Sequence, residues 1–518
     1  YTNMELIQVL WVDDEITRLQ PHIHFLEEKG YAVHPCTNGP DALDLVKEQP
    51  FDIVLLDENM PGMDGLAVLS EIKQIYPNLA VIMITKSEAE TLMEEAIGAK
   101  IADYLIKPVN PNQILLSLKK NLDNSRLVAE KTTMDYQRSF QELNIDISRA
   151  NDYEDWSAIY QKLCFWELEI DAMESSDLHE ILNHQKSEAN HMFSKYISSN
   201  YEDLVNGGSP LVMSHQMIEK LVLDKLSKDT TTLLVVIDNL RLDQWRVLQT
   251  HLSPFYKLQE EQICSSILPT ATQYARNALF AGELPVNIKR LYPDLWKDDT
   301  DAGGKNLFEK ELLAAQFSAL ERDISFSYHK INRQDQGNKL AAQLQNESDN
   351  DLCVVVYNFV DVISHAKTEM EIIKELASSD KAFRSLTATW FQNSPLLEII
   401  KRAQSLGFAL MITTDHGTIN VRQPSRILGD RESSTNIRYK TGKRLNSDDK
   451  NLYTVLNPEE IGLPKINLSS SFTFATEDKY LIYPSNYNHF VNFYRNTYQH
   501  GGVSFEEMLI PFAVLSPK

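Results

Sequence analysis

Residues 4–122 alternate short apolar runs with predicted helices. We interpret the apolar runs as buried strands, and they cover residues 7–12, 31–34, 51–56, 80–84 and 103–106. Strands that alternate with helices along the chain are typical of a doubly wound parallel sheet with helices on its faces. The pattern therefore predicts an N-terminal α/β domain.

The next segment, residues 123–207, has a different pattern. It contains almost no glycine or proline, and its apolar residues recur at helical spacing, as at Trp156, Tyr160 and Leu163. This pattern predicts two or three amphipathic helices that form a small bundle and connect the flanking domains. The glycine-rich break at residues 206–210 marks its far end.

Residues 208–518 return to buried strands that end in polar residues. A segment at 265–282 begins like a strand, passes through a hydroxyl-rich turn and continues as a predicted helix. The combination predicts a C-terminal α/β domain. The apolar runs of this domain cover residues 233–237, 352–356, 408–412 and 508–515.

Composition and charge limit the possible partners. The chain has 518 residues, enough for about three domains, and a formal net charge of −23. That charge, together with the lack of a basic helix-turn-helix pattern, predicts no duplex DNA binding. The four cysteines are widely separated and form no C-x-x-C pair, which indicates reduced thiols in a cytoplasmic protein. No apolar run is long enough to predict a membrane span.

Charged and hydroxyl side chains follow the predicted strands of the first domain. Asp13 and Asp14 follow the first strand, Asp57 the third, and Lys107 the fifth, while Thr85 ends the fourth. The carboxyl ends of parallel strands lie at one edge of a sheet, so we expect these side chains to meet. The alternative is that the acidic residues are helix N-caps or solvated loop ends.

The motifs VLWVDDE, DIVLLDENMPGMDG, MIT and ADYLIKP resemble the receiver domain of two-component response regulators. The resemblance implies that Asp57 is phosphorylated in response to a sensor histidine kinase. It also implies that Asp13, Asp14 and Asp57 bind Mg²⁺, which prefers carboxylate oxygens. Three further roles follow from it: a phosphate-pairing lysine at Lys107, a switch hydroxyl at Thr85 and a switch aromatic residue at Tyr104.

In the last domain, the strand at residues 408–412 leads into Asp415, His416 and Gly417. Adjacent residues of a strand point to opposite faces, so this aspartate and histidine can converge only in the loop beyond the strand. We expect Gly417 to allow a sharp turn of the backbone there. A carboxylate with an imidazole suits zinc or manganese, and a simple polar turn is the alternative.

Other potential metal ligands occupy similar positions. Asp238 directly follows one predicted strand, and His500 lies in the polar loop before the last one. Asp361 and His365 follow the strand at 352–356, and their spacing of four would place both on one face of a helical turn. Each residue alone could be a solvated polar side chain, but their shared position at strand ends favours a metal site.

Thr270 and Thr272 lie where the predicted helix of residues 265–282 begins. The free N–H groups and the dipole at a helix N-terminus favour a bound phosphate. A threonine at this position is also a common N-cap, which is the alternative explanation.

The order of these motifs resembles the alkaline phosphatase superfamily, in particular PglZ-type output domains and nucleotide pyrophosphatase/phosphodiesterases. The resemblance implies Thr272 as the catalytic nucleophile, because glycine follows ten residues after the second threonine of P-T-x-T. Ala275 stands where the phosphodiesterase branch has asparagine, so we expect Arg276 or Asn277 to contact a substrate phosphate. The resemblance also implies two zinc ions per chain, one bound by Asp238, Thr272, Asp415 and His416 and the other by Asp361, His365 and His500.

The complete order of receiver, helical connector and phosphatase-like domain resembles the PorX-type response regulators. That resemblance implies a cytoplasmic regulator of type IX secretion that dimerises when it is phosphorylated. Two functions stay open. One is a zinc-dependent phosphodiesterase that acts on nucleotides or oligonucleotides. The other is a signalling scaffold with a structural zinc site that binds a protein such as the secretion machinery or a sigma factor.

Overall fold

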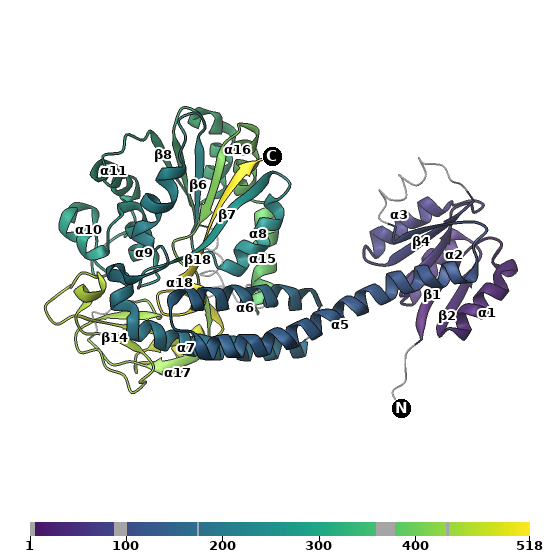
Figure 1. Cartoon of the computed structure of the whole chain (residues 1–518), viewed down its shortest axis with the longest axis horizontal. Helices are drawn as coiled ribbons and strands as arrows, with labels where there is room; N and C mark the ends of the chain where they lie inside the picture. The colour runs from purple at the N-terminus through teal and green to yellow at the C-terminus, as the bar shows by residue number, and fades with distance from the viewer. Residues whose placement is uncertain (1–5, 87–100, 174–175, 359–378, 431–434) are drawn as a thin grey trace. The chain divides into compact units, whose positions relative to one another are not determined.

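The computed structural model describes residues 6–86, 101–173, 176–358, 379–430 and 435–518. The chain divides into two compact units, Tyr1–Ser139 and Phe140–Lys518. One continuous helix, α5 (Pro111–Arg149), contains the boundary between them (Figure 1). None of the described helices is both long enough and apolar enough to cross a membrane.

The first unit contains the predicted parallel sheet. Its described elements are β1 (Ile7–Val12), α1 (Gln20–Glu28), β2 (Tyr31–Cys36), α2 (Gly39–Glu48), β3 (Ile53–Asp57), α3 (Gly65–Ile75), β4 (Ala80–Thr85) and β5 (Asp103–Ile106). The strand order is β2-β1-β3-β4-β5. Alternate residues of each strand face opposite sides of the sheet, so Trp11 and Leu10 belong to two different cores. The helix predicted between the fourth and fifth strands falls largely at residues 87–100, outside the described residues.

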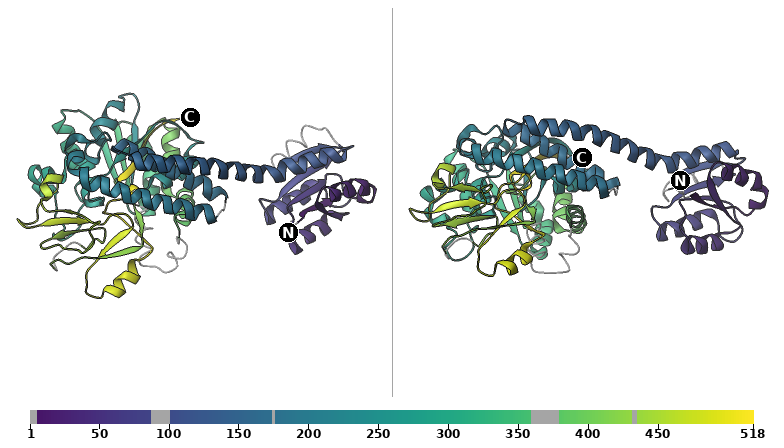
Figure 2. Two further views of the ribbon diagram at one scale, coloured as in Figure 1. Left: turned by 60° about the horizontal axis from the view of Figure 1, so that its bottom comes forward. Right: turned by 90° about the horizontal axis from the view of Figure 1, so that it is seen from below.

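The predicted helical connector is confirmed as the end of α5 together with α6 (Tyr153–Met173) and α7 (Ser176–Asp203). The two views in Figure 2 show α6 and α7 lying against the C-terminal domain. Phe505, on the short helix α18 (Phe505–Met508), stacks on Phe193 of α7 and Tyr160 of α6, with ring centroids 4.5 Å and 5.3 Å away. An aromatic cluster therefore packs the connector helices onto the C-terminal domain.

The C-terminal domain is organised around a six-stranded sheet. Its strands are β6 (Thr232–Ile237), β7 (Tyr256–Ser265), β8 (Phe326–Ile331), β9 (Leu352–Tyr357), β10 (Ala409–Thr413) and β18 (Leu509–Pro517), in the order β7-β18-β10-β6-β9-β8. β10, β6, β9 and β8 are parallel, whereas β18 is antiparallel to its two neighbours. Every residue of β6 and β9 is buried, as expected for parallel strands covered on both faces.

Helices and small sheets surround this main sheet. The helices are α8 (Leu242–Leu252), α9 (Thr272–Ala281), α10 (Pro285–Leu291), α11 (Glu309–Ala319), α12 (Gln334–Gln343), α15 (Asp380–Gln392), α16 (Pro395–Ser405) and α17 (Tyr487–Tyr494). The remaining strands are β11 (Ile419–Val421), β12 (Gln423–Arg426), β13 (Tyr439–Gly442), β14 (Tyr453–Val455), β15 (Ser471–Phe474), β16 (Lys479–Ile482) and β17 (Thr497–Gln499). β11 pairs antiparallel with β17, with Ile419 opposite Gln499, which brings the chain after His416 close to the chain before His500.

The C-terminal end of α9 is defined by two specific residues. The helix ends at Gly282, whose φ of 69° is in the left-handed region that glycine adopts readily. The buried side chain of Gln316, on α11, donates hydrogen bonds of 3.2 Å to the carbonyl oxygens of Leu279 and Phe280. These bonds satisfy carbonyls of the last helical turn, which have no partner within the helix.

We predict that Gln316→Ala lowers the free energy of unfolding of the C-terminal domain by about 2 kcal/mol, because buried carbonyls lose their donor. Denaturant unfolding of the full chain measures the effect. Ser318→Ala, at an exposed position of the same helix, is the matched control and should change stability by less than about 0.5 kcal/mol. Equal stability of the two variants would contradict the capping role.

Candidate functional site

Thr272 is the first residue of α9, so its predicted position at a helix N-terminus is confirmed. Its Oγ1 donates a 3.4 Å hydrogen bond to Asp238 Oδ1 and lies 3.1 Å from His416 Nε2. Thr270 instead donates its hydroxyl to the carbonyl oxygen of Gly502 and is fully buried. The structure therefore places Thr272, rather than Thr270, beside the acidic and imidazole side chains.

Asp238, Asp415 and His416 form a compact buried group. They follow β6 and β10, which pair in parallel with Thr413 opposite Val236, so the carboxyl ends of both strands lie at one edge of the sheet. His416 Nε2 is 3.8 Å from Asp238 Oδ1 and 3.6 Å from Asp415 Oδ2. One ligand atom from each residue lies within 4.8 Å of the others. Atoms at these separations can ligate one ion at about 2.0 Å.

The chemistry of Asp415 fits a bound cation. Its Oδ1 accepts hydrogen bonds from the backbone N–H groups of Asn239 and His416, but its buried Oδ2 accepts none from the described residues. Burial alone would raise the pKa of Asp415, but His416 and the guanidinium of Arg276 outweigh it and lower that pKa. A buried carboxylate oxygen that stays charged without a hydrogen bond is costly unless a cation lies nearby.

The imidazole of His416 is oriented for the same role. Its Nδ1 lies 3.0 Å from the carbonyl oxygen of Gly417. A carbonyl can only accept, so Nδ1 carries a proton, and Nε2, the nitrogen that can bind a metal, points towards Asp238 and Thr272. The structure thus brings together all four residues that we predicted as ligands of the first ion.

The second predicted ligand set is only partly described. The ring of His500 stacks on that of His416, with centroids 4.2 Å apart and planes at 20°. His500 Nδ1 lies 3.1 Å from the carbonyl oxygen of Thr270, which orients this ring as well. Asp361 and His365 lie outside the described residues. The structure therefore places one ligand of the second set directly beside the first.

Arg276 is a buried cation that contacts the acidic residues of the site. Its Nη1 is 3.0 Å from Asp238 Oδ2 and 3.7 Å from Asp415 Oδ2, and its Nε is 2.7 Å from Glu309 Oε1. Burial would lower the pKa of Arg276, but the carboxylates raise it well above its ordinary value. Asn277, the other expected phosphate contact, donates its amide to the backbone carbonyls of Gln273 and Lys305, and its contact with a phosphate stays a prediction.

Residues 294–350 contain none of the site residues predicted from the sequence, yet they support the site. Asn306 donates a 3.0 Å hydrogen bond to the carbonyl oxygen of Thr272. Glu309 fixes Arg276, and Lys330 Nζ lies 3.5 Å from Glu309 Oε2. These contacts join parts of the chain far apart in sequence, so no local spacing indicates them.

Gly417 is required for close packing, whereas we predicted it for a sharp turn. Gly417 does not have the positive φ that glycine adopts more readily than other residues, so its backbone conformation is not what requires glycine here. A Cβ atom at this position would lie 1.8 Å from the carbonyl oxygen of Glu506 and 3.5 Å from Cγ of Arg241. The backbone beside His416 therefore rests against α18 with no space for a side chain.

The predicted phosphorylation site of the first unit is also assembled. Lys107 Nζ is 2.8 Å from Asp13 Oδ2 and 3.1 Å from Asp57 Oδ2. Asp13, Asp14 and Asp57 each offer an oxygen within 4.8 Å of the others. Burial raises the pKa of Asp57 despite Lys107, and its buried Oδ1 accepts no hydrogen bond from the described residues. This set of oxygens fits Mg²⁺, whose charge would offset that burial.

The two predicted switch residues, Thr85 and Tyr104, lie on the neighbouring strands β4 and β5. The hydroxyl of Thr85 donates to the carboxylate of Glu58, the residue after Asp57. Tyr104 is half-buried and packs against the sheet core that contains Met83. Their switching roles stay predictions.

Comparison with known protein families divides the chain into three parts. The model of the BREX system PglZ alkaline phosphatase-like domain matches residues 217–515. The PorX response regulator linker domain matches residues 126–205, and the response regulator receiver domain matches residues 9–119.

Individual relatives match the receiver region. The transcriptional regulatory protein ZraR of Escherichia coli is 36% identical over 126 residues, which are 24% of this chain and 29% of the relative. The alginate biosynthesis regulator AlgB of Pseudomonas aeruginosa is 34% identical over 122 residues, or 24% and 27% of the two chains. A solved receiver domain from Clostridium thermocellum is 30% identical, covering 24% of this chain and 98% of that one, with a TM-score of 0.23. The chain thus spans under a third of these curated relatives.

If the buried group binds zinc, as the sequence predicts, we expect Gly417→Ala to weaken that binding at least about tenfold, because the added Cβ forces His416 and its neighbours away from Asp238. Equilibrium dialysis against a zinc buffer measures the affinity. Gly407→Asn is the matched control at the other end of β10, where φ is 76° and nothing lies near the Cβ position. Parental zinc affinity in Gly417→Ala would show that this close packing does not hold the site.

Proposed function

The chain belongs to the family of BREX system PglZ alkaline phosphatase-like domains, here joined to a receiver and a PorX-type linker, and from this we propose that it is a response regulator with a zinc-dependent phosphodiesterase output. A sensor histidine kinase is its proposed partner and type IX secretion its proposed process. The proposed zinc ligands are Asp238, Thr272, Asp415 and His416 for one ion and Asp361, His365 and His500 for the other.

The observation that carries this proposal is the position of the Thr272 hydroxyl. It lies at the N-terminus of α9 and within 3.4 Å of both Asp238 and His416. A polar turn or a simple N-cap would not need two buried ligand side chains beside the same hydroxyl. A helix N-terminus also stabilises the negative charge of a phosphate at this point.

The side chains support a two-step displacement. Thr272 Oγ1 attacks phosphorus while the bond to the leaving oxygen breaks, and the hydroxyl proton ends on the leaving alcohol. Water then attacks the same phosphorus, which releases Thr272 and leaves a phosphate monoester. When bound here, zinc supplies Lewis-acid stabilisation of the charge that develops on the phosphoryl oxygens.

The charges around Thr272 favour diesters over monoesters. A monoester phosphate carries an additional negative charge and needs a further cation to be held. Arg276 is already bound to Asp238 and Glu309 and is only 1% exposed. We therefore propose nucleotides or short oligonucleotides with internal diesters as the substrates.

The receiver is proposed to control this activity. A phosphoryl group on Asp57 offers oxygens to Lys107 and Thr85, and Tyr104 moves with the loop after β4. The face that contains β5 and α5 then changes shape and dimerises. Because α5 continues without a break to Arg149, dimerisation acts directly on the connector helices.

We predict that Thr272→Ala reduces the hydrolysis of bis-nitrophenyl phosphate by about a thousandfold or more, because the nucleophile is lost. Thr272→Ser is the matched control and should keep measurable activity, since it retains a hydroxyl. The parent should hydrolyse the diester faster than mono-nitrophenyl phosphate. Faster turnover of the monoester would reject the phosphodiesterase, and bound zinc with no hydrolysis would favour the scaffold function.

We predict that beryllofluoride with Mg²⁺, a mimic of phosphorylated Asp57, raises both the dimer fraction and the hydrolysis rate. A coupling of a few kcal/mol is enough to convert a mostly monomeric population into a mostly dimeric one. Sedimentation velocity and the diester assay follow the two effects, and Asp57→Ala should abolish both. An unchanged mass and rate in the parent would rule out control by dimerisation.

A further inference from the structure

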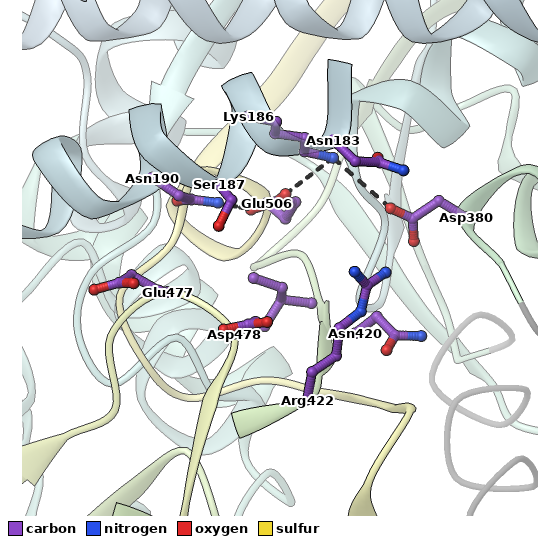
Figure 3. Close-up of a pocket in the computed structure, with 11 residues that line it drawn as sticks. Asn183, Lys186, Ser187, Asn190, Asp380, Asn420, Arg422, Glu477, Asp478 and Glu506 are labelled. Atoms are coloured by element: carbon purple, nitrogen blue, oxygen red, sulfur yellow. Dashed lines mark hydrogen bonds and ion pairs between the residues drawn. The ribbon is translucent and has the colours of Figure 1, made fainter. Parts of the chain in front are cut away.

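Lys186, on α7, is buried among carboxylates from three other helices. Its Nζ lies 2.9 Å from Glu167 Oε1 of α6, 3.0 Å from Glu506 Oε1 of α18 and 3.7 Å from Asp380 Oδ2 of α15. Figure 3 shows the last two of these ion pairs. Burial would lower the pKa of Lys186, but the three carboxylates raise it well above its ordinary value, so the amine is charged.

One branch of this cluster leads to the loop that carries His416. Glu506 pairs with Lys186 and also accepts a 2.8 Å hydrogen bond from Asn190, a second residue of α7. The carboxamide of Asn190 also accepts a hydrogen bond from the N–H of Phe505. The carbonyl oxygen of Glu506 is the atom that lies against Gly417, next to His416. α7 therefore fixes the short helix on which the His416 loop rests.

The other branch leads to the loop that carries Asp238. Asp380 accepts hydrogen bonds of 2.9 Å from Arg241 and 2.6 Å from the hydroxyl of Tyr498. Arg241 follows Asp238 by three residues, and its side chain is the second group that packs on Gly417. Both branches from Lys186 thus reach Gly417, the residue after the predicted ligand His416: one through the carbonyl oxygen of Glu506 and the other through the side chain of Arg241.

A buried ion cluster of this kind fixes geometry more than it stabilises the fold. The free energy lost when these charges are removed from water is about as large as the free energy gained from the ion pairs. Apolar residues of similar volume would therefore stabilise the fold equally well. What the ion cluster provides beyond apolar packing is a defined position for each helix, because each charged partner must lie at hydrogen-bond distance.

We propose that Lys186 is a positioning residue for the zinc site, through which connector helix α7 holds the Asp238 and His416 loops in register. α7 lies within the region that matches the PorX linker, so the linker takes a direct part in the output site. A shift of α7 relative to the sheet would then change metal binding. This inference takes from the proposed function only that the bound metal is zinc. It does not require that the site hydrolyses diesters.

The test compares the zinc affinity of full-length variants by competition with a chelator, well below the unfolding temperature. Lys186→Met should weaken zinc binding by about 10- to 100-fold, as loss of groups that orient metal ligands does. Lys186→Arg keeps the charge and should recover most of the affinity. On the diester, Lys186→Met should lower kcat with little change in KM, because the substrate does not contact this residue.

Two further variants separate positioning from stability. Lys186→Met leaves buried carboxylates unpaired and lowers the unfolding temperature. Adding Glu506→Gln removes one of those charges, so the double variant should unfold at a higher temperature than Lys186→Met while its zinc affinity stays low. Leu182→Ala, at a buried apolar position of α7, should lower stability but keep parental zinc affinity.

Each outcome decides the proposal. Parental zinc affinity in Lys186→Met overturns it, and so does an affinity that follows the unfolding temperature across all variants. A parent that binds zinc without hydrolysing diesters rejects the phosphodiesterase alone, because the affinity comparison needs no hydrolysis. A parent that binds no zinc rejects both.

Discussion

The site depends on the negative charge buried at the carboxyl edge of the output sheet. Asp238, Asp415 and Glu309 are buried carboxylates. Arg276 lies within 3.7 Å of all three, and Lys330 Nζ lies 3.5 Å from Glu309 Oε2. Ionised carboxylates withdrawn from water need compensating charge. The divalent cation proposed at Asp238, Asp415 and His416 would supply it, and the same cation would serve the proposed catalysis.

The positions of the buried site residues depend in turn on the elements packed around the sheet. The geometry of the loops at the strand ends depends on what packs behind them as well as on their own hydrogen bonds. Here the support is α18, which the connector helices hold through the ring of Phe505 and the side chain of Glu506. The connector is therefore more than a spacer, because it is built into the support of the site.

Local patterns in the sequence predicted the strands and the residues at their ends. The run at 233–237 ends at Asp238 and the run at 408–412 leads to Asp415, because burial of a strand and its polar end are both local features. The partners of these residues could not be predicted in this way. Contacts of Arg276 with Glu309 and of Lys186 with Glu506 join distant segments. A glycine needed for a turn and one needed for close packing, such as Gly417, also look alike in a sequence.

Anomalous diffraction at the zinc absorption edge, from crystals of the full chain grown with zinc, tests the central claim most directly. The account predicts a peak bounded by Asp238, Asp415 and His416, within coordination distance of Thr272 Oγ1. A density map without zinc at this group, or with zinc only at other residues, would contradict it.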